Sequence, residues 1–257
     1  MDFTDAVLLG LVQGLTEFLP ISSSGHLVIA QHLLTGFKQP GILFDVILHF
    51  GSLIAVLLFF KKEIQNIIKG IVQGEKRERA QAVYIIAGTI PTVIIALIFN
   101  DVIDDFFHSV TLVGVMLIVT GTFLFLSGKL KKQDKSDVTL WDALIIGTVQ
   151  GIAIIPGVSR SGITISAALF RKVDPVAAGR FSFLLSIPAI IGAVILEGRH
   201  LSSLDPGLLP TYLTGAIAAL LSGLASIKVL MVFLKSRRFS VFAYYCWILG
   251  SLTIILL

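Results

Sequence analysis

Charged residues and cysteine are scarce in this sequence. Only 14% of its 257 residues are charged, 55% are hydrophobic, and the mean hydropathy is +0.93. This composition excludes a soluble domain and predicts a polytopic membrane protein. The single cysteine, Cys246, lies in an apolar run, which excludes a disulfide framework and a cysteine-based metal site, so we expect a packing residue. The first residues lack a basic segment followed by a small-residue cleavage site, so we expect no removable signal peptide.

The net charge of +4 does not indicate a nucleic-acid partner, because the basic residues gather in short linkers. Linker 61–80 carries six Lys and Arg residues and linker 129–140 carries four lysines. Linker 100–109 carries neither Lys nor Arg, but has three aspartates. By the positive-inside rule, the two basic linkers are predicted to be cytoplasmic and the acidic linker is predicted to be outside.

The chain contains two kinds of apolar segment, and in each half one short, interrupted segment precedes three longer ones. Two segments, each interrupted once, are too short for the roughly 20 residues of a spanning helix. They run over 3–19 with 24–34 and over 141–155 with 160–171. We expect each to form a re-entrant hairpin whose non-helical backbone is shielded by protein or lines a wet cavity. Six longer segments are predicted to cross the membrane, at 42–60, 81–99, 109–128, 181–197, 210–233 and 240–257.

The two broken segments are copies of each other at an offset of 137 residues. Val12-Gln13-Gly14 matches Val149-Gln150-Gly151, and Ser22 matches Ser159. Residues 1–130 and 138–257 are therefore predicted to be internal repeats within one membrane domain, 1–257. Each repeat has one hairpin and three crossings, an odd number, so the two repeats have opposite orientation and their broken tips can meet near the midplane. The expected fold is an all-α polytopic membrane protein with an inverted-topology repeat.

An ionisable group at membrane depth indicates a functional site by default. Gln13 and Glu17 are four residues apart, so on a helix they share one face. One interpretation is structural, with Gln13 bonded to a neighbouring helix and Glu17 paired with Arg160. The other is a carboxylate that binds a divalent cation or acts as a general base, with Gln13 as second ligand. Oxygen ligands suit Mg²⁺ or Ca²⁺ better than zinc, and no HExxH motif is present.

Both short helices after the breaks begin with groups that can receive an anion. Serine hydroxyls and glycine N–H groups at a helix start can serve as ordinary caps or as a phosphate cradle. The second start also carries Arg160, whose planar fork suits a phosphate or diphosphate. Thr164 is the weakest candidate, because most helical threonines bond to their own helix. The candidate substrate-binding residues beside Gln13 are Ser22, Ser24, Gly25, Ser159, Ser161, Gly162 and Thr164.

The histidines divide into candidates and packing residues. His26 follows the first helix start directly and can accept a phosphoryl group or protonate a leaving group. His32, His108 and His200 lie near loop ends and are expected to be packing residues. Asp45 and His49 are four residues apart, a spacing equally compatible with support of the site and with a structural pair.

Three runs in order, QGLTE at 13–17, FLPISSSGH at 18–26 and PGVSRSGIT at 156–164, closely resemble the undecaprenyl-diphosphate phosphatase family, also called bacitracin-resistance proteins. The similarity covers essentially the full length, including the run 180–183, Arg-Phe-Ser-Phe. The resemblance implies a multi-pass enzyme of the bacterial inner membrane that removes the terminal phosphate of undecaprenyl diphosphate and so recycles the lipid carrier for cell-wall synthesis. It also implies divalent-metal dependence and a site that faces outward. The expected partners are this polyprenyl lipid and membrane lipids, with a homodimer as a possible assembly.

By position, the resemblance implies catalytic roles for Glu17, Ser23, His26 and Arg160, and places Ser159 and Thr164 in the arginine motif. Some family members have glutamate where this chain has Gln13, so Glu17 would hold the metal largely alone. The attack on phosphorus is compatible with His26 itself or with Ser23 activated by His26.

Two other classes compete with the phosphatase interpretation. An inverted repeat that meets at the midplane is also typical of transporters and flippases. The lipid phosphatase superfamily shares fragments of its motifs with Ser24-Gly25-His26 and Ser159-Arg160, but Ser166 stands where its second histidine is expected.

Overall fold

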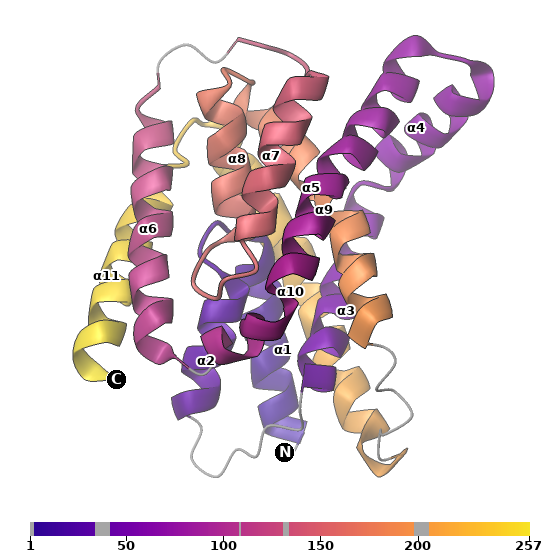
Figure 1. Ribbon diagram of the computed structural model, residues 1–257. Helices are drawn as coiled ribbons and strands as arrows, with labels where there is room; N and C mark the ends of the chain where they lie inside the picture. Colours follow the sequence, from indigo (N-terminus) through magenta and orange to yellow (C-terminus); the bar gives the residue numbers. More distant parts are fainter. Residues whose placement is uncertain (1–2, 34–41, 108, 131–133, 198–205) are drawn as a thin grey trace.

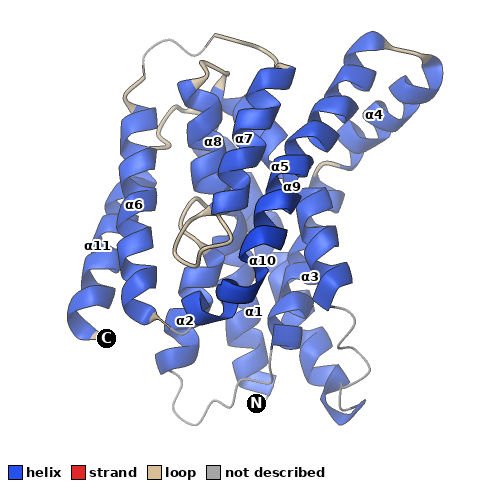
Figure 2. Ribbon diagram, in the orientation of Figure 1, coloured by secondary structure: helices blue, strands red, loops and turns tan. Residues whose placement is uncertain are grey.

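A computed structural model describes residues 3–33, 42–107, 109–130, 134–197 and 206–257. Within these ranges every regular element is helical, apart from one isolated bridge between Lys135 and Val173 (Figures 1 and 2). The helices are α1 Phe3–Phe18, α2 Ser23–Leu33, α3 Ile42–Phe59, α4 Lys61–Gln73, α5 Lys76–Phe107, α6 Val110–Gly128, α7 Leu140–Ile152, α8 Arg160–Phe170, α9 Pro175–Glu197, α10 Leu209–Lys235 and α11 Val241–Leu256, with a short 3₁₀ turn at Pro206–Leu208.

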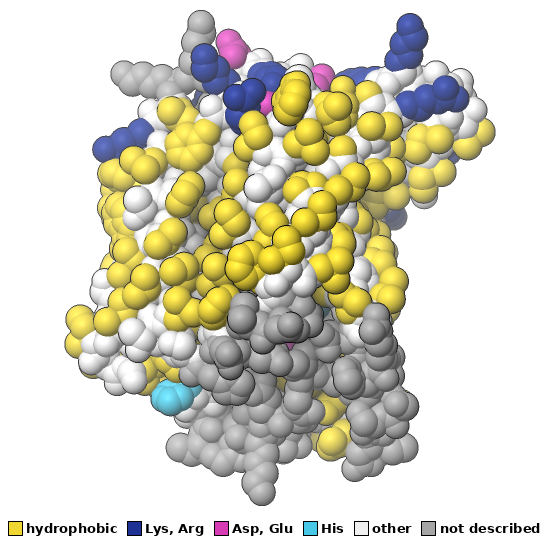
Figure 3. Space-filling view, in the orientation of Figure 1, with side chains coloured by type: hydrophobic (Ala, Val, Ile, Leu, Met, Phe, Trp, Pro, Cys, Tyr) yellow, Lys and Arg dark blue, Asp and Glu magenta, His cyan; other side chains and the backbone are white. Residues whose placement is uncertain are grey.

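Four helices are long and apolar enough to cross a membrane, and the bent pair of α3 and α4 would make a fifth span. The four are the Lys76–Phe99 part of α5, then α6, α9 over Pro175–Leu196, and α10. Their outward residues are apolar: Ile86 and Ile98 of α5 are 63% and 69% exposed. Figure 3 shows hydrophobic side chains over the middle of the molecule and Lys and Arg at one end. The all-helical membrane architecture predicted from the sequence is confirmed in these terms.

The linker predicted at 61–80 is helical, so the prediction of a loop there was wrong. Ile64, Ile67 and Ile71 recur every three or four residues, the period of an amphipathic helix, and they form one side of α4. Gly74 ends α4 in the left-handed conformation, with φ +82°, and its N–H bonds back to the last turn. The prediction of an acidic linker at 100–109 was wrong for the same reason, because the helix α5 continues to Phe107.

The two broken helix pairs enter from opposite ends, and their connecting loops meet at mid-height. Figure 1 shows α1 and α2 in one half of the molecule and α7 and α8 in the other. The Ser22 hydroxyl accepts the Gly157 N–H at 3.2 Å, and the Ser161 hydroxyl donates to the Leu19 carbonyl at 3.1 Å. Gly157 has φ +92°, where a side chain would be strained. The loops are therefore joined by direct hydrogen bonds.

Small residues bring each broken pair close to a long helix. A Cβ at Gly10 of α1 would lie 2.3 Å from the Gly215 carbonyl oxygen of α10. A Cβ at Gly147 of α7 would lie 1.8 Å from the Gly88 carbonyl oxygen of α5. Gly10 and Gly147 are equivalent in the two sequence copies, so both copies use the same close approach of helix backbones. Cys246 of α11 is buried and its thiol donates to the Pro20 carbonyl at 3.6 Å, which confirms its expected packing role.

Candidate functional site

An ion pair joins the two tips. Glu17 lies at the end of α1 and Arg160 is the first residue of α8, and the distance from Arg160 Nη2 to Glu17 Oε1 is 2.7 Å. Both side chains are largely buried, at 6% and 16% exposure. The structure thus brings together the two charged residues singled out in the two repeats. A buried pair of this kind is costly to break, since the remaining charge would lose its partner.

The second carboxylate oxygen of Glu17 accepts a hydrogen bond from Ser23. The Ser23 hydroxyl donates to Glu17 Oε2 at 2.5 Å, a short charge-assisted hydrogen bond. The Gln13 amide donates to the same oxygen at 3.0 Å. Sequence reasoning paired Ser23 with His26, whereas the structure pairs it with Glu17. The nearest base for the Ser23 proton is therefore a carboxylate.

Gln13 lies at the centre of a buried polar cluster and contacts Glu17, His49 and Ser52. Its amide nitrogen also lies 3.0 Å from His49 Nδ1 and 3.2 Å from the Ser52 hydroxyl. An amide nitrogen only donates, so in this contact His49 Nδ1 is the acceptor. His49 therefore belongs to the site, while Asp45 accepts from Gln31 at 3.0 Å.

Two buried atoms of this cluster have no hydrogen-bond partner among the described residues. They are Oε1 of Gln13 and Nη1 of Arg160, an acceptor and a cationic donor. Orphaned buried polar atoms are rare in native proteins and call for a ligand or water. The pair of atoms matches a bound cation at Gln13 and a bound anion at Arg160.

His26 is held at both ring nitrogens. Nδ1 lies 2.7 Å from the Ser22 carbonyl oxygen, which only accepts, so Nδ1 carries the proton. Nε2 lies 2.7 Å from the hydroxyl of Tyr245, which donates to its lone pair. The two rings stack with centroids 5.7 Å apart and planes 6° apart. When His26 is neutral, its proton is on Nδ1 and the lone pair of Nε2 faces α11.

Sequence reasoning missed Tyr245. It stands 219 residues after His26, in an apolar helix with no motif around it. The one available signal was a tyrosine hydroxyl within a membrane-embedded helix, where a polar group needs a partner.

Most of the candidate anion ligands hold the tips in place in this structure. Ser22 caps the Gly25 N–H at 3.2 Å besides its bond to the other tip, and Ser159 caps the Gly162 N–H at 3.1 Å. The Thr164 hydroxyl bonds to the Arg160 carbonyl at 2.7 Å and lies 2.6 Å from the Ser182 hydroxyl. These groups orient Arg160 instead of facing an open space.

Ser24 is the least enclosed of the tip hydroxyls. It is half-buried, and its hydroxyl lies 3.3 Å from that of Ser22. Among the expected packing histidines, His32 is exposed in the last turn of α2, and His108 and His200 lie outside the described residues.

The donor set suits a lightly held hard cation. In the described part of the chain, no group of three His, Cys, Asp or Glu residues is arranged as a metal site. Glu17 and the unpartnered Gln13 Oε1 offer two oxygen atoms. Mg²⁺ is often held by one or two carboxylates plus substrate phosphates and water, so these residues fit a cation that arrives with a phosphorylated substrate.

Comparison with known proteins identifies the family to which this chain is similar. The model of a family described as bacitracin resistance protein BacA matches residues 6–252. A protein named undecaprenyl-diphosphatase in Syntrophotalea carbinolica is 47% identical, with 98% of each chain covered. Proteins of the same name in Halothermothrix orenii and Alkaliphilus metalliredigens are 47% and 41% identical, over 100% and 97% of this chain and 98% and 97% of theirs. Because these matches span nearly the whole chain, it belongs to the bacitracin resistance protein BacA family.

Proposed function

We propose that this protein hydrolyses undecaprenyl diphosphate to undecaprenyl phosphate, which recycles the lipid carrier for cell-wall polysaccharides and confers bacitracin resistance. The full-length relatives named undecaprenyl-diphosphatase support this function. The observation that carries it is the cluster of Glu17, Ser23 and Arg160 at the junction of the tips. The proposed nucleophile, the proposed base and the cation proposed for phosphate are in contact with one another in this cluster.

Arg160 is the proposed first contact for the diphosphate. Its Nη1 is buried without a partner in the described part, and its Nη2 holds Glu17. A phosphoryl group carries more negative charge than one carboxylate and accepts both N–H groups of the guanidinium fork. As the substrate takes Arg160, Glu17 Oε1 would be released from the guanidinium and could meet the proposed cation, while Oε2 stays beside Ser23 as its base. Substrate binding and the arrangement of the nucleophile are thereby coupled.

Ser23 is the proposed nucleophile. Its oxygen attacks the terminal phosphorus while its proton passes to Glu17 Oε2, 2.5 Å away. The bond from phosphorus to the bridging oxygen breaks, and the monophosphate lipid leaves with the electron pair. Glu17 gives this proton to the leaving lipid phosphate and is a carboxylate again; it then takes a proton from the water that attacks the phosphoserine, and returns that proton to the Ser23 oxygen as inorganic phosphate is released. Phosphoryl transfer depends mainly on position and charge, which Arg160 supplies.

His26 is the competing nucleophile, because its Nε2 lone pair is available once Tyr245 moves aside. The two routes differ in a chemical property of the intermediate. Phosphoserine survives acid, whereas phosphohistidine is hydrolysed by acid. Trapping the enzyme with labelled substrate should give an acid-stable adduct that disappears in Ser23→Ala; an acid-labile adduct that disappears only in His26→Gln would reject the serine route.

A divalent cation, Mg²⁺ or Ca²⁺, is the proposed cofactor. Glu17 and Gln13 would hold it, and when bound it would offset negative charge on the phosphates. Because Gln13 is uncharged, we expect the cation to bind together with the substrate and only weakly without it.

The finer topology is also proposed. The opposite entry of the two broken pairs supports an inverted repeat with six crossings, in which α3 and α11 are the short or bent spans. The basic end of the molecule is then cytoplasmic in a bacterial inner membrane, and the α1–α2 hairpin opens the site to the outer face. Transport of a polyprenyl phosphate is the alternative function that this same arrangement favours.

Phosphate release by the purified protein in detergent separates the two functions. The wild type should release phosphate from a polyprenyl diphosphate without any membrane to cross, and Glu17→Gln and Arg160→Ala should not. A transporter without phosphatase activity would release none, and full activity in both variants would refute the assigned site.

A further inference from the structure

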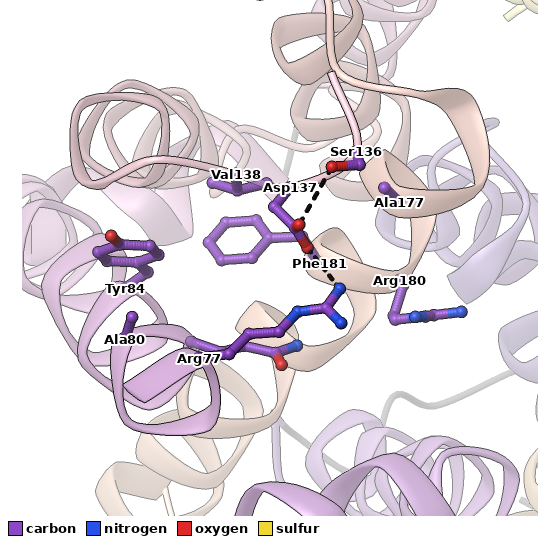
Figure 4. Close-up of a pocket in the computed structure, with 10 residues that line it drawn as sticks. Arg77, Ala80, Tyr84, Ser136, Asp137, Val138, Ala177, Arg180 and Phe181 are labelled. Atoms are coloured by element: carbon purple, nitrogen blue, oxygen red, sulfur yellow. Dashed lines mark hydrogen bonds and ion pairs between the residues drawn. The ribbon is translucent and has the colours of Figure 1, made fainter. Parts of the chain in front are cut away.

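A pocket lies at the basic end of the molecule, between α5, the segment before α7, and α9 (Figure 4). Its volume is about 280 Å³, and it shares no residue with the cluster around Glu17. Pockets for drug-sized ligands usually begin near 300 Å³, so this one suits a small group. It is lined by Arg77, Ala80, Gln81, Tyr84, Ser136, Asp137, Val138, Ala177, Arg180 and Phe181.

One wall of this pocket is fixed by the backbone. The Lys135 N–H donates to the Lys172 carbonyl at 3.0 Å, and the Asp174 N–H donates to the Lys135 carbonyl at 2.9 Å. The side chain of Lys135 also bonds to Asp142, which accepts from Arg171 at 2.9 Å. The wall residues that follow Lys135 are therefore held before any ligand arrives, which lowers the entropy lost on binding.

The pocket carries one uncompensated positive charge. Arg77 donates to Asp137 at 2.9 Å, and this bond, helped by the charge of Arg180, holds the pKa of Asp137 below its usual range. Asp137 is thus an anion that offsets one of the two arginines. Arg180 is exposed and makes no hydrogen bond or close ion pair with another residue in the described ranges. In Figure 4 the guanidinium of Arg77 points towards Asp137, whereas the side chain of Arg180 extends away from both.

Beneath the charged rim the pocket is apolar. Phe181 is 4% exposed and belongs to the main core, and Val138 and Ala177 line the same pocket. Val83 and Ile86 are 53% and 63% exposed farther along α5, but they lie on the face of the helix turned away from the residues that line the pocket. The pocket itself therefore offers its charged rim to a phosphate, and Phe181, Val138 and Ala177 to the apolar groups next to that phosphate.

We propose that this pocket binds the phosphate group of an anionic membrane amphiphile, with Arg180 as the principal contact and Arg77 shared with Asp137. Arginine's fork binds phosphate through two parallel hydrogen bonds. Basic pockets between membrane helices on the cytoplasmic side suit acidic lipid headgroups. This site is independent of the phosphatase reaction, because it needs neither Glu17 nor Arg160.

The test is native mass spectrometry of the purified full chain, titrated with phosphatidylglycerol and, as a zwitterionic control, phosphatidylcholine. Phosphatidylglycerol should bind more tightly, and Arg180→Gln should weaken it about tenfold, as expected for loss of a charged hydrogen-bonding group. The matched control is Arg238→Gln, since Arg238 is an exposed basic residue outside the pocket. Asp137→Asn should change binding in the opposite direction and strengthen it, because it frees Arg77.

Equal weakening by Arg180→Gln and Arg238→Gln would overturn the site, as would equal binding of the two lipids. Loss of binding in Asp137→Asn would do the same. Two further probes identify the source of the phosphate. Arg180-dependent binding of a polyprenyl monophosphate above that of phosphatidylglycerol would assign the pocket to the isoprenoid lipid. Arg180-dependent binding of inorganic phosphate at equal affinity would assign it to free phosphate.

Discussion

Replacing Tyr245 by phenylalanine removes one hydroxyl and leaves the ring that stacks on His26. The hydroxyl donates to His26 Nε2 at 2.7 Å, and the stacked rings lie 6° from parallel. A neutral hydrogen bond contributes about 0.5 to 1.5 kcal/mol, which corresponds to roughly a 2- to 12-fold effect. If the hydroxyl positions the imidazole for the reaction, kcat should fall by this factor and KM should change little.

A second measurement is independent of turnover. Diethyl pyrocarbonate reacts with an unprotonated imidazole nitrogen, and in the wild type the Tyr245 hydroxyl occupies the free nitrogen of His26. Tyr245→Phe should therefore speed modification of His26, measured by peptide mass against the His26→Gln background. The control is Tyr244→Phe. Tyr244 lies on α11 next to Tyr245, but its ring packs against Trp247 of α11 and Phe125 of α6 instead of His26. Unchanged kcat together with an unchanged modification rate would refute the positioning role.

Three further predictions address packing, the cation and pH. Gly147→Ala should strongly lower the melting temperature of the purified protein, because the new Cβ would lie 1.8 Å from the Gly88 carbonyl oxygen; an unchanged melting temperature would show that α5 and α7 separate easily. Gln13→Glu should lower the Mg²⁺ concentration for half-maximal phosphate release, since it adds a charged oxygen beside Glu17; an unchanged concentration would remove residue 13 from the metal site. The pKa of Asp137 is lowered mainly by its bond to Arg77, so the stability it contributes is present above its ordinary pKa of 3.8 and is lost as the pH falls through the lower folded value. Acidification from about pH 5 to 3 should therefore lower the melting temperature more in the wild type than in Asp137→Asn, by a small amount because the pair is exposed; equal losses would contradict this.

The broken helices were predictable because their signals are local. Pro20 and the polar run after it interrupt an apolar segment, and the predicted break at 20–23 agrees with the end of α1 at Phe18 and the start of α2 at Ser23. The helix within the predicted linker at 61–80 is not evident from the charges of this segment, which indicate only its side of the membrane. The apolar period of Ile64, Ile67 and Ile71 within it, which favours a helix, was overlooked.

The proximity of Glu17 and Arg160 was also predictable, but the hydrogen bonds made by the residues around them were not. Opposite orientation of the two copies allows their tips to meet near the midplane, which predicts that Glu17 and Arg160 lie close together. Whether Ser23 donates to Glu17 or to His26 depends on rotamers at the tip, and sequence spacing carries no information on these. The contact between His26 and Tyr245 depends on how α11 packs against the tip, across 219 residues of chain.

The most direct test of the central claim is a double-mutant cycle on phosphate release with Glu17→Gln, Arg160→Gln and the double variant. The claim is that these two residues act as one unit at the junction of the tips, where they lie 2.7 Å apart. Residues that act as a unit lose activity non-additively, so each single variant should lose roughly 100-fold or more and the double variant little beyond the worse single. Losses that multiply in the double variant would show that Glu17 and Arg160 act separately, and would contradict the account.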